Sequence, residues 1–408
     1  MTAGSERGLP EAVRLLARPD PGIESPVPRR RICGFGLSLV LTSQLPCLFG
    51  IRASSAAASP DGELLETLST RARRSFRDVA KRGLPGALIG IRQGAGEAAA
   101  LALGVADVET GAPMTTEMTM RLGSLAKLFV GTVALQLVDE RRIGLDDAVS
   151  AYRPDVPGGA WMTLRMLGNH TSGLFNPLRD PAFRERVNRA PARHIPREEI
   201  LQVAFRNTWA RPTDGGFSYS NANTILLADI IEKVTAEPIM GLLRARVLEP
   251  FGARGIAMPW THELAAPAPR GYRFGARQGA IEYGEVFFDA TGFSASWAGA
   301  AGNMNGTLDD LLSVARGLAS GATLSAESRH EQRRFLGLGA SLDYGFGLAR
   351  YGRALGHAGD VPGFSSFLAW HPDRDAVVVV LANLSNLADK SAPATLLGRA
   401  LLSDLEDA

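Results

Sequence analysis

Apolar residues are spaced differently in successive parts of the chain, and each spacing predicts a particular element. Residues 61–83 show the periodicity of an amphipathic helix that ends at Gly83. Residues 86–94 and 97–108 indicate two strands joined by a glycine-containing turn. Residues 124–142 are apolar nearly all round and stop before Gly144, which predicts a helix buried in the core.

The remainder of the chain divides into a helical middle and a strand-rich end. From about residue 145 to 290 the pattern predicts helices and loops, with few and short strand signals. Consecutive strands and a final helix are expected at residues 344–352, 354–360, 364–370, 376–383 and 390–406. Strands at both ends of the chain indicate an α/β (α+β) fold, in which one sheet is assembled from the two ends and carries helices on its faces.

The same pattern gives a division into domains. Residues 59–144 and 290–408 would form a split sheet-and-helix domain. Residues 145–289 would form an all-helical insertion, and residues 1–58 an N-terminal extension with a signal peptide.

Composition and charge narrow the class of protein. A length of 408 residues and a hydrophobic fraction of 45% suffice for a large core. The net charge of +2 comes mainly from residues 1–58; without them the chain has 37 basic and 38 acidic residues, so no nucleic-acid partner is expected. Both cysteines lie in that segment, and the six histidines form no zinc motif. We therefore expect no metal, cofactor or disulfide in the body of the protein.

The N-terminal segment has the features of an export signal. Arg29, Arg30 and Arg31 precede an apolar stretch, and the small residues 54–59 offer a cleavage site, with cleavage after Ala58 favoured. The alternative is an uncleaved membrane anchor, which would be the protein's only contact with a membrane. Either way the body is expected outside the cytoplasm, in the periplasm or the extracellular medium.

Ser124 and Lys127 are the first candidates for chemistry. Three residues apart at the start of a helix, their side chains share one face. A lysine in an apolar site has a lowered pKa and can take the proton of a serine nucleophile, and the helix N-terminus favours developing negative charge. A capping serine beside a lysine that extends to the surface is an equally simple explanation.

Two further motifs place polar side chains on shared faces. Tyr219 and Asn221 are two residues apart before a helix, so both could enter one pocket, although a core tyrosine with Asn221 as an N-cap would give the same pattern. His357 and Gly359 lie on a predicted strand. The missing side chain at Gly359 lets a substrate approach the backbone, and a neighbouring N–H could complete an oxyanion hole. A lone histidine in a sheet is more often structural.

Taken together, the order S-x-x-K, Y-x-N, H-x-G resembles that of the penicillin-recognising serine hydrolases. This family includes class C β-lactamases, D-alanyl-D-alanine carboxypeptidases and esterases of the same fold. The resemblance covers about residues 84 to 390 and includes RLGSLAKLF, NHTSGL, YSNANTILLADIIEKVT, YGFGL and GHAGDVPGFSS. It implies a β-lactamase/transpeptidase-like fold, with an antiparallel sheet flanked by helices.

The resemblance also implies roles for individual residues. Ser124 would be the acyl-accepting nucleophile, Lys127 its base, Tyr219 the proton shuttle to the leaving group, and Asn221 a ligand of the acyl side chain. His357 would replace the lysine of the family's K-T-G motif. The N–H groups of Ser124 and Asp360 would hold the oxyanion. The implied function is that of an exported serine hydrolase that cleaves a small ester, amide or D-amino-acid peptide.

Two alternatives remain, and one departure from the family pattern bears on them. The chain could be a D-alanyl-D-alanine carboxypeptidase, or a penicillin-binding sensor or inactive binding protein. Ala358 and Asp360 replace hydroxyl residues that often flank the glycine. The Asp360 carboxylate should repel a substrate carboxylate unless Arg350 or Arg353 neutralises it. We therefore expect neutral esters and amides to be better substrates than free acids.

Overall fold

The structure is a computed structural model that describes residues 60–208, 216–276, 281–337 and 343–407. The expected export segment, with Cys33, Cys47 and the cleavage position after Ala58, lies outside these residues. Within them, every helix is too short or too polar to cross a membrane.

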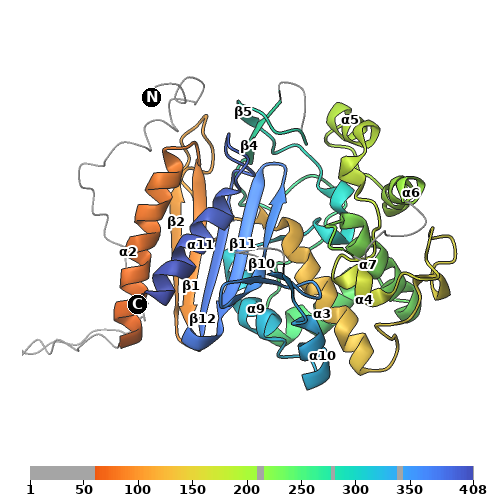
Figure 1. Cartoon of the computed structure of the whole chain (residues 1–408). Coiled ribbons are helices and arrows are strands. Elements are labelled where there is room, and N and C mark those ends of the chain that lie inside the picture. Colours follow the sequence, from red (N-terminus) through yellow and green to blue (C-terminus); the bar gives the residue numbers. More distant parts are fainter. Residues whose placement is uncertain (1–59, 209–215, 277–280, 338–342, 408) are drawn as a thin grey trace, which may run out of the picture.

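One antiparallel sheet joins the two ends of the chain (Figure 1). Its order is β2-β1-β12-β11-β10-β9-β8-β7. The strands are β1 (Gly86–Gln93), β2 (Ala98–Gly104), β7 (Leu336–Gly337), β8 (Asp343–Tyr344), β9 (Ala349–Tyr351), β10 (Ala354–Val361), β11 (Phe364–His371) and β12 (Ala376–Ala382). Because β1 pairs with β12 from Ala87 opposite Ala382 onward, the prediction of a sheet built from both chain ends is confirmed.

Helices cover both faces of this sheet, as its apolar strands require. On one face, α2 (Pro60–Ala80) and α11 (Pro393–Glu406) pack together against β1, β11 and β12. On the other lies α9 (Leu308–Ser320). Successive side chains of a strand point to opposite faces, so Ile89 joins the cluster under α2 and α11 while Leu88 joins the cluster on the other side.

The helix expected at residues 124–142 is the central helix of the second cluster. It begins as a short 3₁₀ turn, Gly123–Leu125, and continues as α3 (Ala126–Asp139). All residues of α3 from Ala126 to Leu137 are buried, which explains why its sequence has no polar face. It contacts α7 (Asn221–Thr235), α8 (Ile239–Leu243) and α10 (Ala326–Gln332), and α4 (Leu164–Gly168) and α6 (Arg197–Asn207) pack on α7. The remaining helix of this part, α5 (Pro181–Arg189), lies at the edge of the molecule (Figure 1).

The segment 145–289 is not all-helical, and the prediction was wrong in this respect. β4 (Tyr272–Gly275) pairs with β5 (Val286–Asp289), and the Tyr272 N–H donates to Gly363 O at 3.1 Å and to Asn383 O at 2.9 Å. A second small pair joins β3 (Met120–Arg121) to β6 (Asn305–Gly306). Strands of two to four residues are too short to show a clear periodicity. The division of the chain at residues 145 and 289 stays a prediction.

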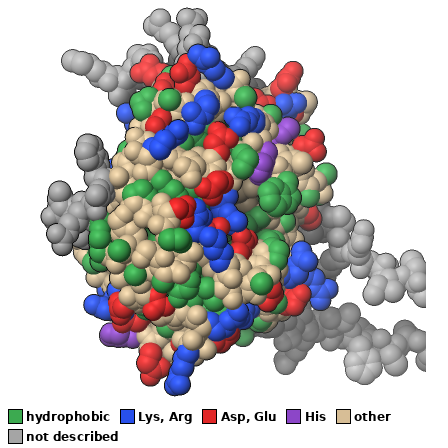
Figure 2. Space-filling model, turned by 90° about the vertical axis from the view of Figure 1, so that its right-hand side faces the viewer, with side chains coloured by type: hydrophobic (Ala, Val, Ile, Leu, Met, Phe, Trp, Pro, Cys, Tyr) green, Lys and Arg blue, Asp and Glu red, His purple; other side chains and the backbone are tan. Residues whose placement is uncertain are grey.

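Charged side chains are mixed in sign on the face shown in Figure 2, where basic and acidic groups lie next to one another. That face therefore lacks a broad basic patch of the kind that binds nucleic acid.

Candidate active site

Ser124 lies in the 3₁₀ turn that leads into α3, and Lys127 is the second residue of that helix. Their separation of three residues brings Lys127 Nζ to 2.9 Å from Ser124 Oγ. Ser124 is partly exposed, whereas Lys127 is only 1% exposed. The serine does not cap a helix and the lysine does not extend to the surface, so neither simple structural explanation fits these two residues.

The Lys127 amine has three oxygen neighbours. Besides Ser124 Oγ, Nζ lies 2.9 Å from Asn221 Oδ1 and 2.8 Å from Ala301 O. Burial lowers the pKa of Lys127 well below its usual value. A neutral amine has two N–H donors and one lone pair. If the two N–H groups donate to Asn221 and Ala301, the lone pair is left to accept the Ser124 hydroxyl proton.

Tyr219 approaches the same serine from the segment before α7. Its Oη lies 3.0 Å from Ser124 Oγ, and its ring centroid is 4.8 Å from Lys127 Nζ. Burial is the main cause of the raised pKa of Tyr219, so its phenol stays protonated. Ser220, between Tyr219 and Asn221, caps α7 through its side chain. The alternative of Asn221 as the N-cap is therefore wrong, and both neighbours of Ser220 are free to contact the site.

Two backbone N–H groups meet beside Ser124. A Cβ atom on Gly123 would lie 2.9 Å from Asp360 N, and one on Gly359 would lie 3.0 Å from Ser124 N. Pro362 and Gly363 form the turn between β10 and β11, and this register directs the Asp360 N–H away from β11. The arrangement fits an oxyanion hole. Gly123, at φ +54°, was not singled out from the sequence, although a glycine just before a nucleophile is a readable signal for such a close approach.

His357 is close to these groups but buried. It is 4% exposed; its Nε2 lies 3.0 Å from Tyr344 Oη and its Nδ1 lies 2.6 Å from Ala358 O. Burial lowers the pKa of His357 to about 3, so the imidazole is neutral at physiological pH. Its placement favours support of the strand and of Tyr344 rather than a cationic contact with substrate.

A buried polar cluster behind Tyr219 was missed from the sequence. The ring centroid of His170 lies 4.4 Å from that of Tyr219 and 5.1 Å from that of Tyr344. Its Nδ1 lies 2.9 Å from Asn223 Nδ2, and Asn223 Oδ1 accepts the Ser172 hydroxyl at 2.6 Å. The available signal was Asn223 itself, a polar residue within the apolar run of α7.

The two arginines considered from the sequence as neighbours of Asp360 are paired elsewhere. Arg350 pairs with Asp343, and Arg353 pairs with Asp373 at 2.6 Å, so neither arginine neutralises Asp360, and the exception considered from the sequence does not apply. The reason is that β9 pairs with β10 only from Ala354 to Gly356 and ends before Asp360.

The arginine near Asp360 is Arg273 on β4. Tyr283, from the same hairpin, places its Oη 3.4 Å from Asp360 Oδ2. Burial raises the pKa of Asp360 to about 6, and the opposing effects of the Arg273 charge and the Tyr283 hydrogen bond limit this rise.

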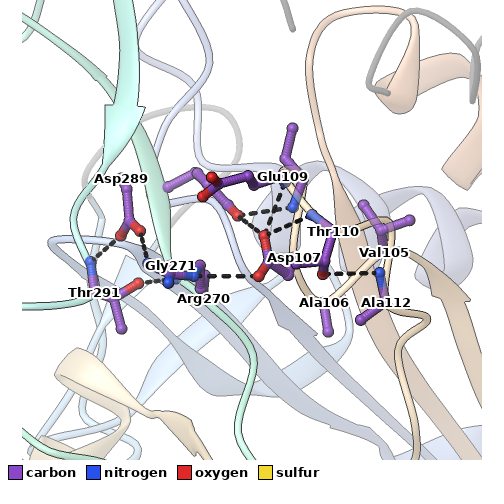
Figure 3. A network of polar contacts seen from close by, with 12 residues as sticks. Val105, Ala106, Asp107, Glu109, Thr110, Ala112, Arg270, Gly271, Asp289 and Thr291 are labelled. Atoms are coloured by element: carbon purple, nitrogen blue, oxygen red, sulfur yellow. Dashed lines mark hydrogen bonds and ion pairs between the residues drawn. The ribbon is translucent and has the colours of Figure 1, made fainter. Parts of the chain in front are cut away.

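Figure 3 shows how this hairpin is joined to the loop after β2. Arg270, just before β4, donates to Asp289 Oδ2 at 2.6 Å and to Asp107 Oδ2 at 3.3 Å in the loop after β2. The Gly271 N–H donates to Thr291 Oγ1 at 2.8 Å. These contacts tie both ends of the hairpin to the loop after β2 and thereby fix the backbone that carries Arg273.

Known proteins resemble this chain over most of its length. A putative penicillin-binding protein, PbpX, from Bacillus subtilis (strain 168) is 24% identical over 65% of this chain and 62% of its own length. A D-aminopeptidase of Cereibacter sphaeroides (strain ATCC 17029) is 28% identical over 76% of this chain and 59% of its own length. The chain thus spans about 60% of the length of these curated relatives.

A solved structure and a family model extend the likeness. The structure of a D-stereospecific amidohydrolase from Streptomyces sp. has 26% sequence identity and a TM-score of 0.69, covering 78% of this chain and 94% of that one. This confirms the β-lactamase/transpeptidase-like fold. The family described as beta-lactamase matches residues 72–402. The chain belongs to the beta-lactamase family, within the penicillin-recognising serine hydrolases.

Proposed function

We propose that this protein is an exported serine hydrolase that cleaves a small ester, amide or D-amino-acid peptide through an acyl-enzyme on Ser124. The observation that carries the proposal is that Lys127 Nζ and Tyr219 Oη both lie within hydrogen-bond distance of Ser124 Oγ, at 2.9 and 3.0 Å. A serine hydroxyl with a base on one side and a proton donor on the other is an activated nucleophile.

Acylation follows from the protonation states of these groups. Ser124 Oγ bonds to the substrate carbonyl carbon while its proton passes to Lys127 Nζ. The negative oxygen of the tetrahedral intermediate is stabilised by the N–H groups of Ser124 and Asp360. When the carbon–nitrogen or carbon–oxygen bond breaks, Tyr219 gives its proton to the leaving group and regains one from Lys127.

Deacylation reverses these roles. Water attacks the acyl carbon and gives a proton to the same base, and Ser124 Oγ leaves and is reprotonated. The products are a carboxylic acid and an amine or alcohol. Asn221, held by Lys127, would contact the acyl side chain with its amide N–H groups.

The substrate class is supported by what the relatives are called. One relative is named a D-aminopeptidase, and one similar solved structure is named a D-stereospecific amidohydrolase. For this protein we propose the same kind of hydrolysis, and we propose the role of each site residue with it.

The proposal is tested by turnover and covalent labelling with the purified protein. Wild type should hydrolyse p-nitrophenyl acetate and take up a fluorescent penicillin, and Ser124→Ala should do neither while keeping its melting temperature. Ser313→Ala is the matched control, because its hydroxyl bonds Asp309 O on the exposed side of α9. A stable label without turnover would indicate a penicillin-binding sensor, and neither label nor turnover would refute the proposal.

Export is tested separately from catalysis. Fusion of residues 1–58 to a reporter that is active only outside the cytoplasm should give reporter activity, and replacing Arg29, Arg30 and Arg31 by glutamate should abolish it. An inactive reporter with the native segment would remove export from the proposal and leave the chemistry untouched.

A further inference from the structure

Arg273 is a buried arginine with no ion pair among the described residues. The residue is 4% exposed, and among the described residues none accepts a hydrogen bond from its side chain or lies within ion-pair distance. Its Nε is a buried donor left unsatisfied, and its nearest ring is Tyr283, with the centroid 5.8 Å from Cζ. Burying a charged group without hydrogen bonds costs free energy. We therefore expect a bound group that supplies hydrogen-bond acceptors to Arg273.

A second buried arginine in the same region shows what a structural arginine looks like here. Arg121, 3% exposed, donates to Thr291 O at 2.9 Å, to His262 O at 2.6 Å and to Pro362 O at 3.2 Å. Its guanidinium is thus satisfied by the protein itself. Arg273 lacks any such set of carbonyls, and this difference separates a structural role from a binding role.

The groups next to Arg273 define what it could bind. Asp360 supplies a carboxylate that accepts hydrogen bonds, and Tyr283, 47% exposed, borders the place from the hairpin loop. One cation and one anion leave the three residues without net charge. The backbone N–H of Asp360 is assigned to the oxyanion hole. A substrate group that binds the Asp360 carboxylate would therefore be next to the carbonyl that reacts.

We propose that Arg273, Asp360 and Tyr283 form a subsite beside the oxyanion hole for an uncharged carboxamide or peptide group of the substrate. The carbonyl oxygen of that group accepts from the Arg273 guanidinium, and its N–H donates to the Asp360 carboxylate. A free carboxylate has no N–H to donate to Asp360, and an ammonium group has no acceptor for Arg273, so either charged group leaves one side of the subsite unpaired beside a like charge. This inference rests on the proposed hydrolase function and specifies its substrate class.

The raised pKa of Asp360 is consistent with this subsite. With a pKa of about 6 the carboxyl is mostly ionised at neutral pH and can accept the amide N–H. Burial holds the pKa of Arg273 below its usual value, but the guanidinium stays protonated.

The test uses three substrates with one acyl half and leaving groups of different charge. They are N-acetyl-D-alanyl-D-alanine, its C-terminal amide, and N-acetyl-D-alanine linked through an amide to ethylenediamine, which carries an ammonium. Wild type should cleave the C-terminal amide at least tenfold faster, by kcat/KM, than either charged substrate. Asp360→Asn should shift the ratio at least tenfold toward the free acid, and Arg273→Met should shift it at least tenfold toward the ammonium substrate.

Controls separate this inference from the proposed function. Arg350→Met removes a neighbouring arginine that is already paired with Asp343, and the ratios should not change. If Arg273→Met does not fold, the Asp360→Asn variant alone tests the subsite, because asparagine is nearly isosteric with aspartate. Ratios that stay unchanged in the folded variants, or wild type that hydrolyses p-nitrophenyl acetate but no dipeptide, would overturn the subsite and leave the hydrolase standing. Absence of both ester turnover and penicillin labelling would overturn both.

Discussion

Gly123→Ala is expected to inactivate the protein without unfolding it. The added Cβ would lie 2.9 Å from Asp360 N and 3.3 Å from the Gly359 and Asp360 carbonyl carbons, so β10 must move away from the 3₁₀ turn. The two N–H groups would then no longer converge on one oxygen. Loss of one oxyanion donor reduces kcat by about 10²–10³-fold, equivalent to about 2.7–4 kcal/mol of transition-state stabilisation.

The backbone contributes a separate and smaller effect on stability. Gly123 has φ +54°, and a left-handed conformation costs an alanine roughly 1–2 kcal/mol. Gly111 is the matched control, because it has φ +71° and a Cβ there would meet no atom within 4 Å. Gly111→Ala should therefore lower the melting temperature by a few degrees and leave kcat unchanged.

The assay is steady-state hydrolysis of p-nitrophenyl acetate by both variants, with thermal unfolding measured in parallel. Both variants should be folded at the assay temperature, with the lower melting temperature for Gly123→Ala because β10 must shift, and with a large difference in kcat. Equal kcat values for the two variants would refute the assignment of the Ser124 and Asp360 N–H groups as the oxyanion hole.

Three further predictions concern protons. Lys127→Met should reduce kcat at least about a hundredfold, the usual minimum loss of a general base; an active variant would exclude the lysine as base. Tyr219→Phe should lower kcat more than it raises KM, and a change in KM alone would assign Tyr219 to substrate positioning. The preference for amides over free acids should shrink as pH falls through about 6, because protonation of Asp360, which faces Arg273 and Tyr283, removes the repelling charge; a ratio constant from pH 5 to 8 would contradict this.

The parts of the site that were predictable depend on local geometry. Ser124 and Lys127 contact each other because residues three apart at a helix start share a face, and Tyr219 and Asn221 converge because alternate residues of an extended segment do. Both relations can be read from spacing alone. The buried character of α3 was also predictable, since its sequence lacks a polar stripe.

The parts that were missed depend on long-range packing. Arg273 comes near Asp360 only because β4 bonds to Gly363 and Asn383, and nothing in the spacing of these residues shows this. The sequence left open whether Arg350 reaches Asp360 from the adjoining strand, because the length of β9 could not be read from it. His357 was expected to face substrate because of its motif, and its contact with Tyr344 could not be read from the sequence.

Because β1 pairs with β12, the sheet can be completed only after nearly the whole chain has been synthesised. A ribosome delivers Ser124 and α3 well before β10, which carries the other half of the oxyanion hole, and before β12, which lies between β1 and β11. Until β12 emerges, β1 has an open edge, and such contacts between distant segments fold slowly and expose strands to aggregation. A chain that stops short of Ala376 therefore contains the nucleophile and its base but lacks the strand that joins the two parts of its sheet.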